Sequence, residues 1–140
     1  MDDARRRTAR LPLLCARVSS ALLVVLAVSQ AVLAGSFLGG QYDALMLHAM
    51  GARATTITSA VQIGVLGWVW RSGGSRAPLL AGVALTLLLV AEFAAGELRM
   101  AALHIPLGVL IVVGIVQLTT MIWRTPLPPR VGVVRASVTT

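Results

Sequence analysis

Four long apolar stretches separated by short polar segments dominate this chain. We predict helices over about 17–38, 46–70, 78–95 and 101–123, each close to the roughly 20 residues that cross about 30 Å of hydrocarbon. Polar and apolar residues do not alternate along these stretches, which excludes the strands of an outer-membrane barrel. Because helices satisfy their own backbone hydrogen bonds in lipid, we expect transmembrane helices.

The composition leads to the same class of protein. Of the 140 residues, 57% are hydrophobic and 12% are charged, and a soluble domain of this length has too little interior to bury them. We predict an all-α fold, an up-down-up-down bundle of four transmembrane helices built from two parallel helical-hairpin repeats. Residues 1–16 would form a basic cytoplasmic leader. Residues 124–140, which contain three prolines, would form a disordered cytoplasmic tail.

The placement of arginine predicts the orientation of the bundle. One side of the membrane would carry only Asp43, Glu97 and Arg99. By the positive-inside rule, both termini and the middle loop then face the cytoplasm of a bacterial plasma membrane. Membrane topology explains the net charge of +7 better than nucleic-acid binding does, because exposed aromatic side chains that could stack on bases are missing. The arginines on the cytoplasmic side would be Arg5, Arg6, Arg7, Arg10, Arg17, Arg71, Arg76, Arg124, Arg130 and Arg135.

An alternative interpretation of the first apolar stretch stays open. Its basic start, its apolar centre and the sequence Val32-Leu33-Ala34 before Gly35 are also typical of a cleavable signal peptide. The internal repeat favours retention, because it makes the first helix the counterpart of the third. The single cysteine, Cys15, cannot form an internal disulfide or a cysteine-based metal site, and we expect it to be an apolar filler.

The two halves of the chain share a pattern of polar and small residues. Each half has a polar residue and then a glycine in its odd helix, a Leu-His pair at the start of its even helix, a glycine one turn later, and a final Trp-Arg. Both halves would cross the membrane in the same direction, which predicts a parallel repeat of two helical hairpins. The matching positions are Gln30, Gly35, 47–48, Gly51 and 70–71 in the first half, and Glu92, Gly96, 103–104, Gly108 and 123–124 in the second.

His48 and His104, the two histidines of the chain, begin the two even helices. We therefore expect them at the same depth near the outer face, on helices that lie diagonally across the bundle. Two imidazoles that face each other can bind both axial positions of a haem iron. Gly51 and Gly108, one turn below, would let a flat porphyrin approach the backbone. Alternatively, the histidines only hydrogen-bond to loops or water.

Three further residues are candidates for the same site. Glu92 and its counterpart Gln30 are predicted within the membrane, where a carboxylate costs roughly 2.5–3.5 kcal/mol unless it is paired or protonated. Glu92 could tune a haem ligand, relay protons or bind a quinone headgroup, or it could make a structural hydrogen bond between helices. Arg53 could pair with Glu92 or a haem propionate, or extend to the outer headgroups. One stripe of the second helix should face the interior: His48, Gly51, Thr55, Ser59 and Gln62.

The runs Gln30–Gly35 and Leu47–Gly51 together resemble the junction between an odd and an even helix in haem A synthases. From about Arg17 to Trp123 the chain resembles one four-helix half of that family, and it is also similar to small four-span actinobacterial membrane proteins. The resemblance implies that His48 and His104 stand at haem-ligand positions. The family's acidic residue before each histidine and arginine after it are missing, because Leu45, Ala49, Ala101 and Ile105 stand there. The resemblance therefore implies haem binding rather than catalysis.

The sequence leaves two hypotheses for function. In the first, an integral membrane protein binds one b-type haem through His48 and His104 and transfers electrons to a membrane redox partner. In the second, a cofactor-free scaffold or subunit packs against a partner protein or a second copy of itself. The sequence contains no phosphate-binding loop, no CxxC or HExxH motif and no nucleophile with a base. We therefore do not expect the chain to be an enzyme by itself.

Single cysteines introduced at positions 48 and 104, after Cys15 is replaced by serine, should both react with a membrane-impermeant thiol reagent added outside intact cells. The reason is that both positions are predicted at the same outer boundary of the bilayer. A cysteine at position 75, in the middle loop, should react only after lysis. Labelling of positions 48 and 104 from opposite sides would contradict a shared site.

Overall fold

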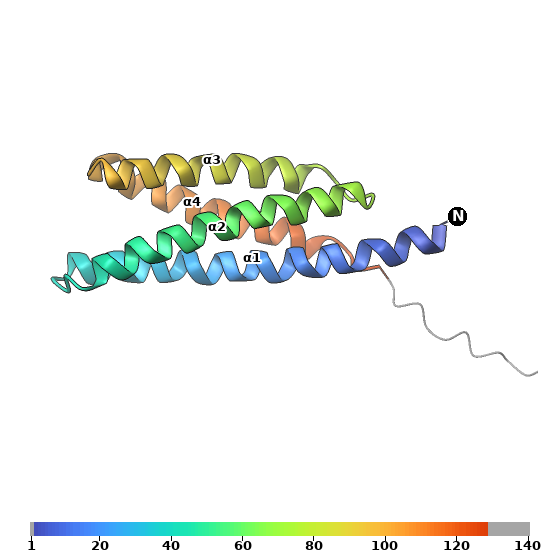
Figure 1. Ribbon diagram of the computed structural model, residues 1–140, viewed down its shortest axis with the longest axis horizontal. Coiled ribbons are helices and arrows are strands. Elements are labelled where there is room, and N and C mark those ends of the chain that lie inside the picture. Colours follow the sequence, from blue (N-terminus) through green and yellow to red (C-terminus); the bar gives the residue numbers. More distant parts are fainter. Residues whose placement is uncertain (1, 129–140) are drawn as a thin grey trace, which may run out of the picture.

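The computed structural model consists of four helices joined by short loops (Figure 1). It describes the backbone of residues 2–128 and the side chains of residues 10–128. No strand occurs in this part of the chain, which confirms the all-α prediction. The helices are α1 (Asp2–Leu38), α2 (Ala44–Arg71), α3 (Ala77–Glu97) and α4 (Ala101–Arg124).

The helix bounds differ most from the prediction at the N-terminus. α1 begins at Asp2 rather than near residue 17, so the segment that we expected to be a leader continues the first helix. Its 37 residues span about 55 Å, which is longer than the hydrocarbon layer requires. The other three helices begin and end within two residues of the predicted bounds, and Pro78 lies in the first turn of α3. Most of the predicted disordered tail, 124–140, lies outside the described residues.

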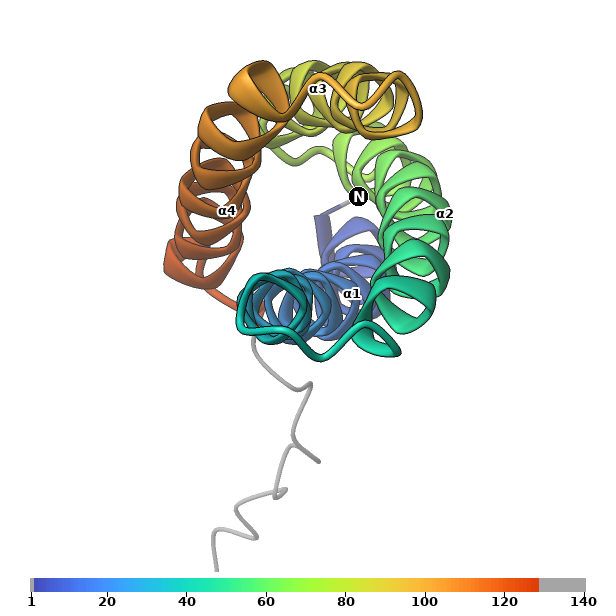
Figure 2. The same ribbon diagram turned by 90° about the vertical axis from the view of Figure 1, so that its left-hand side faces the viewer.

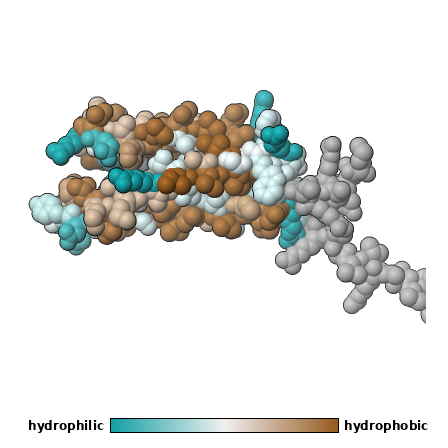
Figure 3. Space-filling view, viewed as in Figure 1, coloured by the Kyte–Doolittle hydropathy of each residue, from teal (hydrophilic) through white to brown (hydrophobic). Residues whose placement is uncertain are grey.

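Three of the four helices are long and apolar enough to cross a membrane, over 10–38, 77–97 and 101–124. We also predicted a span for α2, but this helix does not reach the same mean hydropathy. The reason is its polar stripe, of which Thr55, Ser59 and Gln62 are buried inside the bundle, as the sequence predicted. Hydrophobic residues cover most of the face shown in Figure 3, and hydrophilic residues gather mainly at the two ends.

The four helices follow one another around a ring (Figure 2). Each helix packs against the next, and α4 packs against α1, whereas α2 and α4 lie opposite each other without packing together in the described part of the chain. The loops at 39–43 and 98–100 lie at one end of the bundle, which we name the histidine end (Figure 1). The loop at 72–76 and Arg124 lie at the other end, which we name the arginine end.

The first three helices end in the same way. In each, the second residue past the helix has a left-handed backbone, with φ of 93° at Gly40, 95° at Gly73 and 56° at Arg99. The N–H of the following residue then bonds to a carbonyl five positions back, from Gln41 to Ser36 in the first case. This Schellman arrangement satisfies carbonyls that a helix end would otherwise leave unpaired. It reverses the chain within a few residues and so keeps successive helices side by side.

The apolar core is concentrated toward the arginine end. In α1 the core residues end at Ala27, and in α4 they begin only at Ile111. The part of the bundle nearer the histidine end therefore has no continuous apolar filling, and this is where a cavity forms. The core consists of Leu13, Ala16, Leu23, Ala27, Leu66, Leu85, Leu89, Ile111, Ile115, Leu118 and Ile122.

Buried and half-buried polar side chains link the helices around this core. The Ser19 hydroxyl donates to Gln62, which joins α1 to α2, and Ser59 and Thr86 share a hydrogen bond that joins α2 to α3. The Thr119 hydroxyl donates to the carbonyl of Ser20 at 3.4 Å, which joins α4 to α1. Polar groups facing lipid would have no partner, so these bonds help to fix which face of each helix turns inward.

Arg17 connects α1 to the end of α4 at the arginine end. Its Nη2 donates to the carbonyls of Trp123 at 3.1 Å and Thr125 at 2.7 Å, and its guanidinium lies 5.2 Å from the centre of the Trp123 ring. Arg10 similarly donates to the carbonyl of Pro128 at 3.1 Å. Charge-assisted bonds and a cation–π contact thus join the first helix to the last.

Replacing Ile115 by alanine should lower the free energy of unfolding by about 2 kcal/mol, since its side chain is 1% exposed and its removal leaves a cavity in the core. Little hydrophobic transfer energy is lost in lipid, so mainly the cavity cost remains. The measurement is reversible unfolding with SDS in mixed micelles. Ile57→Ala, at a side chain that is 65% exposed, should stay within about 0.5 kcal/mol of the unmodified protein. Equal losses in the two variants would contradict the described core.

Candidate functional site

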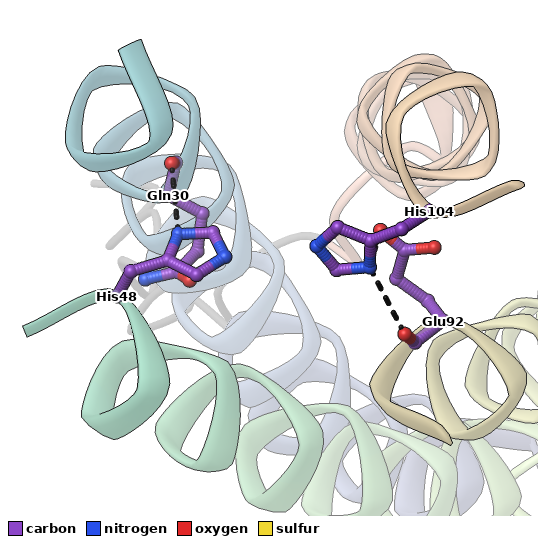
Figure 4. A network of polar contacts seen from close by, with 4 residues as sticks. All are labelled: Gln30, His48, Glu92 and His104. Atoms are coloured by element: carbon purple, nitrogen blue, oxygen red, sulfur yellow. Dashed lines mark hydrogen bonds and ion pairs between the residues drawn. The ribbon is translucent and has the colours of Figure 1, made fainter. Parts of the chain in front are cut away.

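The two histidines of the chain meet inside the histidine end of the bundle (Figure 4). His48 comes from the start of α2 and His104 from the start of α4. Their ring centroids are 6.1 Å apart and their planes are inclined by 81°. Because α2 and α4 lie opposite each other, the two side chains approach across the interior of the ring. The structure thus brings together the two residues that the sequence placed at one depth.

A backbone hydrogen bond holds each imidazole. Nδ1 of His48 lies 3.3 Å from the carbonyl oxygen of Gln30 in α1, and Nδ1 of His104 lies 3.1 Å from that of Glu92 in α3. A carbonyl can only accept, so Nδ1 carries the proton in both rings. Each Nε2 therefore keeps a free lone pair, and the two Nε2 atoms point toward one another in Figure 4.

The two Nε2 lone pairs face each other between mostly apolar walls. An electropositive group placed between the rings would be bound by both of them. A metal bound linearly by two imidazoles places the ring centroids about 6 Å apart, because each metal–nitrogen bond is about 2 Å and each centroid lies about 1 Å further. The spacing between His48 and His104 fits this arrangement.

The side chains of Gln30 and Glu92 each lie against a glycine of the following helix. A Cβ at Gly51 would clash with Nε2 of Gln30, and a Cβ at Gly108 would lie 2.9 Å from Oε1 of Glu92. We expected these glycines to make room for a porphyrin. In the structure the amide of Gln30 and the carboxylate of Glu92 occupy the space beside them. The missing side chains at the two glycines therefore allow α1 to pack closely against α2, and α3 against α4.

Glu92 makes a second contact with the same histidine. Its Oε1 lies 2.9 Å from Nδ1 of His104, so one N–H faces both the carbonyl and the carboxylate of Glu92. Oε2 of Glu92 and Oε1 of Gln30 are buried and have no hydrogen-bond partner within the described part of the chain. These two oxygens stay available to a hydrogen-bond donor that enters the site.

A cavity surrounded by all four helices contains this cluster. Its volume is about 380 Å³, and a second cavity of about 330 Å³ adjoins it and shares His48 and His104. The volumes fall in the range of small-molecule sites, and the walls are mostly apolar. The second cavity reaches the loop after α3, where Glu97 and Arg99 line it. The deeper walls include Ala27, Ala31, Ala34, Leu89, Phe93, Ile111 and Val112.

Some of the candidates are not brought into the site. The side chain of Arg53 is exposed and lines neither cavity. Gly96 lies under the His104 ring, because a Cβ there would be 3.1 Å from its Cε1, whereas a Cβ at its counterpart Gly35, which lines the first cavity, would meet no atom within 4 Å. Over the residues that the structure describes, no three His, Cys, Asp or Glu side chains are grouped to hold a metal ion. A metal between the histidines would therefore take its other ligands from a bound group.

The sequence did not reveal the backbone carbonyls of Gln30 and Glu92 as partners of the histidines. A carbonyl is present at every position, so no residue type marks the two that serve here. The predicted repeat was the available signal, since it paired each polar residue with one histidine.

In protein prepared without added ligand, both imidazoles should be protonated at Nδ1, because each Nδ1 faces a carbonyl oxygen. The ¹⁵N chemical shifts of the ring nitrogens at neutral pH, assigned with His48→Ala and His104→Ala variants, measure this directly. A proton on Nε2 of both rings would contradict the geometry of the site.

The chain matches no protein-family model, no curated protein and no solved structure.

Proposed function

We propose that this protein is a four-span membrane protein that binds one b-type haem, with His48 and His104 as the axial ligands. The observation that carries the proposal is the pair of Nε2 lone pairs, which backbone hydrogen bonds hold toward each other with ring centroids 6.1 Å apart. A macrocycle would supply the ligands that the described side chains do not. The bound iron would supply one-electron chemistry.

The walls of the site support a flat apolar group better than a bare ion. The two adjoining cavities share the histidines and extend from the deep apolar wall to the loop after α3. Phe93 lines both cavities, and Arg99 lines the outer one, where a cationic side chain suits a carboxylate such as a haem propionate. In this proposal the histidines bind, the carbonyls of Gln30 and Glu92 orient them, and the apolar helices exclude water.

The membrane arrangement is part of the same proposal. We infer an up-down-up-down bundle of two parallel hairpin repeats in a bacterial plasma membrane, with both termini cytoplasmic and the histidine end outside. α2 would then be the fourth span, with its polar stripe shielded from lipid by the other helices. The haem A synthase resemblance of the histidine positions supports this assignment, and the expected partners are the bilayer, a membrane redox protein or a second copy.

A second function, a scaffold without cofactor, has one observation in its favour. The carboxamide of Gln30 and the carboxylate of Glu92 already fill the space beside Gly51 and Gly108. Packing of this kind stabilises a bundle whether or not a ligand binds. Such a protein would use its helices to pack against a partner protein.

Protein purified from haem-replete cells, without a histidine tag, should show a Soret band and a low-spin spectrum, because two imidazoles make a strong axial ligand pair. His48→Ala and His104→Ala should each lose that spectrum. Met50→Ala, one half-turn from His48 with its side chain 59% exposed, is the matched control and should keep it. A colourless, folded wild-type protein would refute haem binding and favour the scaffold.

A further inference from the structure

We infer that Glu92 is a positioning residue that makes His104 the more strongly electron-donating of the two haem ligands and places a carboxylate beside only one face of the site. This inference deepens the proposed function and rests on it. The two halves of the site hold their histidines through corresponding residues, Gln30 and Glu92, and only one of these residues carries a carboxylate.

The equivalence is geometric. In each half, a residue of the odd helix accepts the histidine Nδ1–H through its backbone carbonyl, at 3.3 Å for Gln30 and 3.1 Å for Glu92. In each half, the side chain of that same residue also lies against a glycine about one turn after the histidine. Gln30 lies against Gly51, and Glu92 lies against Gly108. The backbone therefore holds the two imidazoles in the same way.

The two halves differ in the side chain at this position, which is an amide in Gln30 and a carboxylate in Glu92. Glu92 Oε1 lies 2.9 Å from Nδ1 of His104, whereas Gln30 gives His48 only its backbone carbonyl. The His104 ring also lies against Gly96, since a Cβ there would be 3.1 Å from its Cε1, whereas a Cβ at the corresponding Gly35 would meet no atom within 4 Å. A carboxylate on the outer nitrogen of a metal-bound imidazole orients the ring and raises its basicity.

Other charged groups do not balance this asymmetry at the depth of the histidines. Glu92 is the one carboxylate in the wall of the deeper cavity, and no arginine lines that cavity. Glu97 and Arg99, at the mouth of the outer cavity, carry opposite charges. Arg53 is exposed on the outside of α2. The field of the Glu92 carboxylate therefore acts on a bound iron with little compensation, and it favours the more positive, ferric form.

The test compares the wild-type protein with Glu92→Gln, Gln30→Glu and the swapped double variant, by redox titration of the haem with mediators that supply the single electron. Glu92→Gln should shift the Fe(III)/Fe(II) equilibrium toward Fe(II) by about tenfold, which is about 59 mV for a one-electron couple. Gln30→Glu should shift it in the opposite direction. The double variant, which only moves the carboxylate to the other half, should return close to the wild-type potential.

A second measurement needs no haem and separates this inference from the proposed function. In ligand-free protein, the Nδ1-bound proton of His104 should resonate further downfield than that of His48, because the carboxylate strengthens its hydrogen bond. The order should reverse in the double variant, which keeps the composition of the site unchanged.

The possible outcomes are distinct. Unchanged potentials in haem-loaded Glu92→Gln, or shifts of the same sign in both single variants, would overturn the inference and leave haem binding intact. A colourless wild-type protein would overturn haem binding, and the proton shifts would then still decide whether Glu92 holds His104 more strongly than Gln30 holds His48. If Glu92→Gln does not fold, the double variant decides, since the downfield proton must move to His48.

Discussion

The need to satisfy polar groups inside an apolar bundle governs this structure. Lipid or other apolar surroundings offer no hydrogen bonds, so polar side chains either bond to a carbonyl of their own helix or turn inward to a neighbouring helix. Gln62 meets Ser19, Ser59 meets Thr86, and Arg17 meets the carbonyls at the end of α4. The same constraint directs the histidines, whose Nδ1 atoms donate to carbonyls of the preceding helix. Structural packing and a candidate site thus arise from one requirement.

Among the described residues, three buried side-chain polar atoms have no hydrogen-bond partner; two of them lie at the histidine site, and the third is Nε of Arg17. Nδ1 of each ring has a carbonyl partner and the two Nε2 atoms face each other, while the unpartnered atoms of the site are Glu92 Oε2 and Gln30 Oε1. At the arginine end the core is filled by large aliphatic side chains such as Leu23 and Ile115. Dense packing at one end and unsatisfied acceptors around a cavity at the other are what we expect of a rigid scaffold that holds a ligand.

The two histidines are held by corresponding parts of the chain. His48 bonds to the carbonyl of Gln30 and His104 to that of Glu92, and the two imidazoles meet at one level of the bundle. Exact equivalence would make the two faces of a group bound between them alike. The exchange of Gln30 for Glu92 at corresponding positions removes the equivalence, since only His104 has a carboxylate on its Nδ1. In the proposed function, this single carboxylate would make the two histidine ligands chemically different.

The sequence by itself determined the helices, because continuous apolar runs and the turn residues Gly40 and Gly73 depend on local chemistry. It also placed His48 and His104 at one level and turned the polar stripe of α2 inward. It did not show that α1 begins at Asp2, since charge alone does not end a helix. Only the tertiary structure decided which carbonyls fix the imidazole tautomers, that Gln30 and Glu92 fill the space beside Gly51 and Gly108, and that Arg53 stays outside. Those relations depend on the rotation of each helix about its axis, which is set by packing against its neighbours and leaves no mark in local sequence.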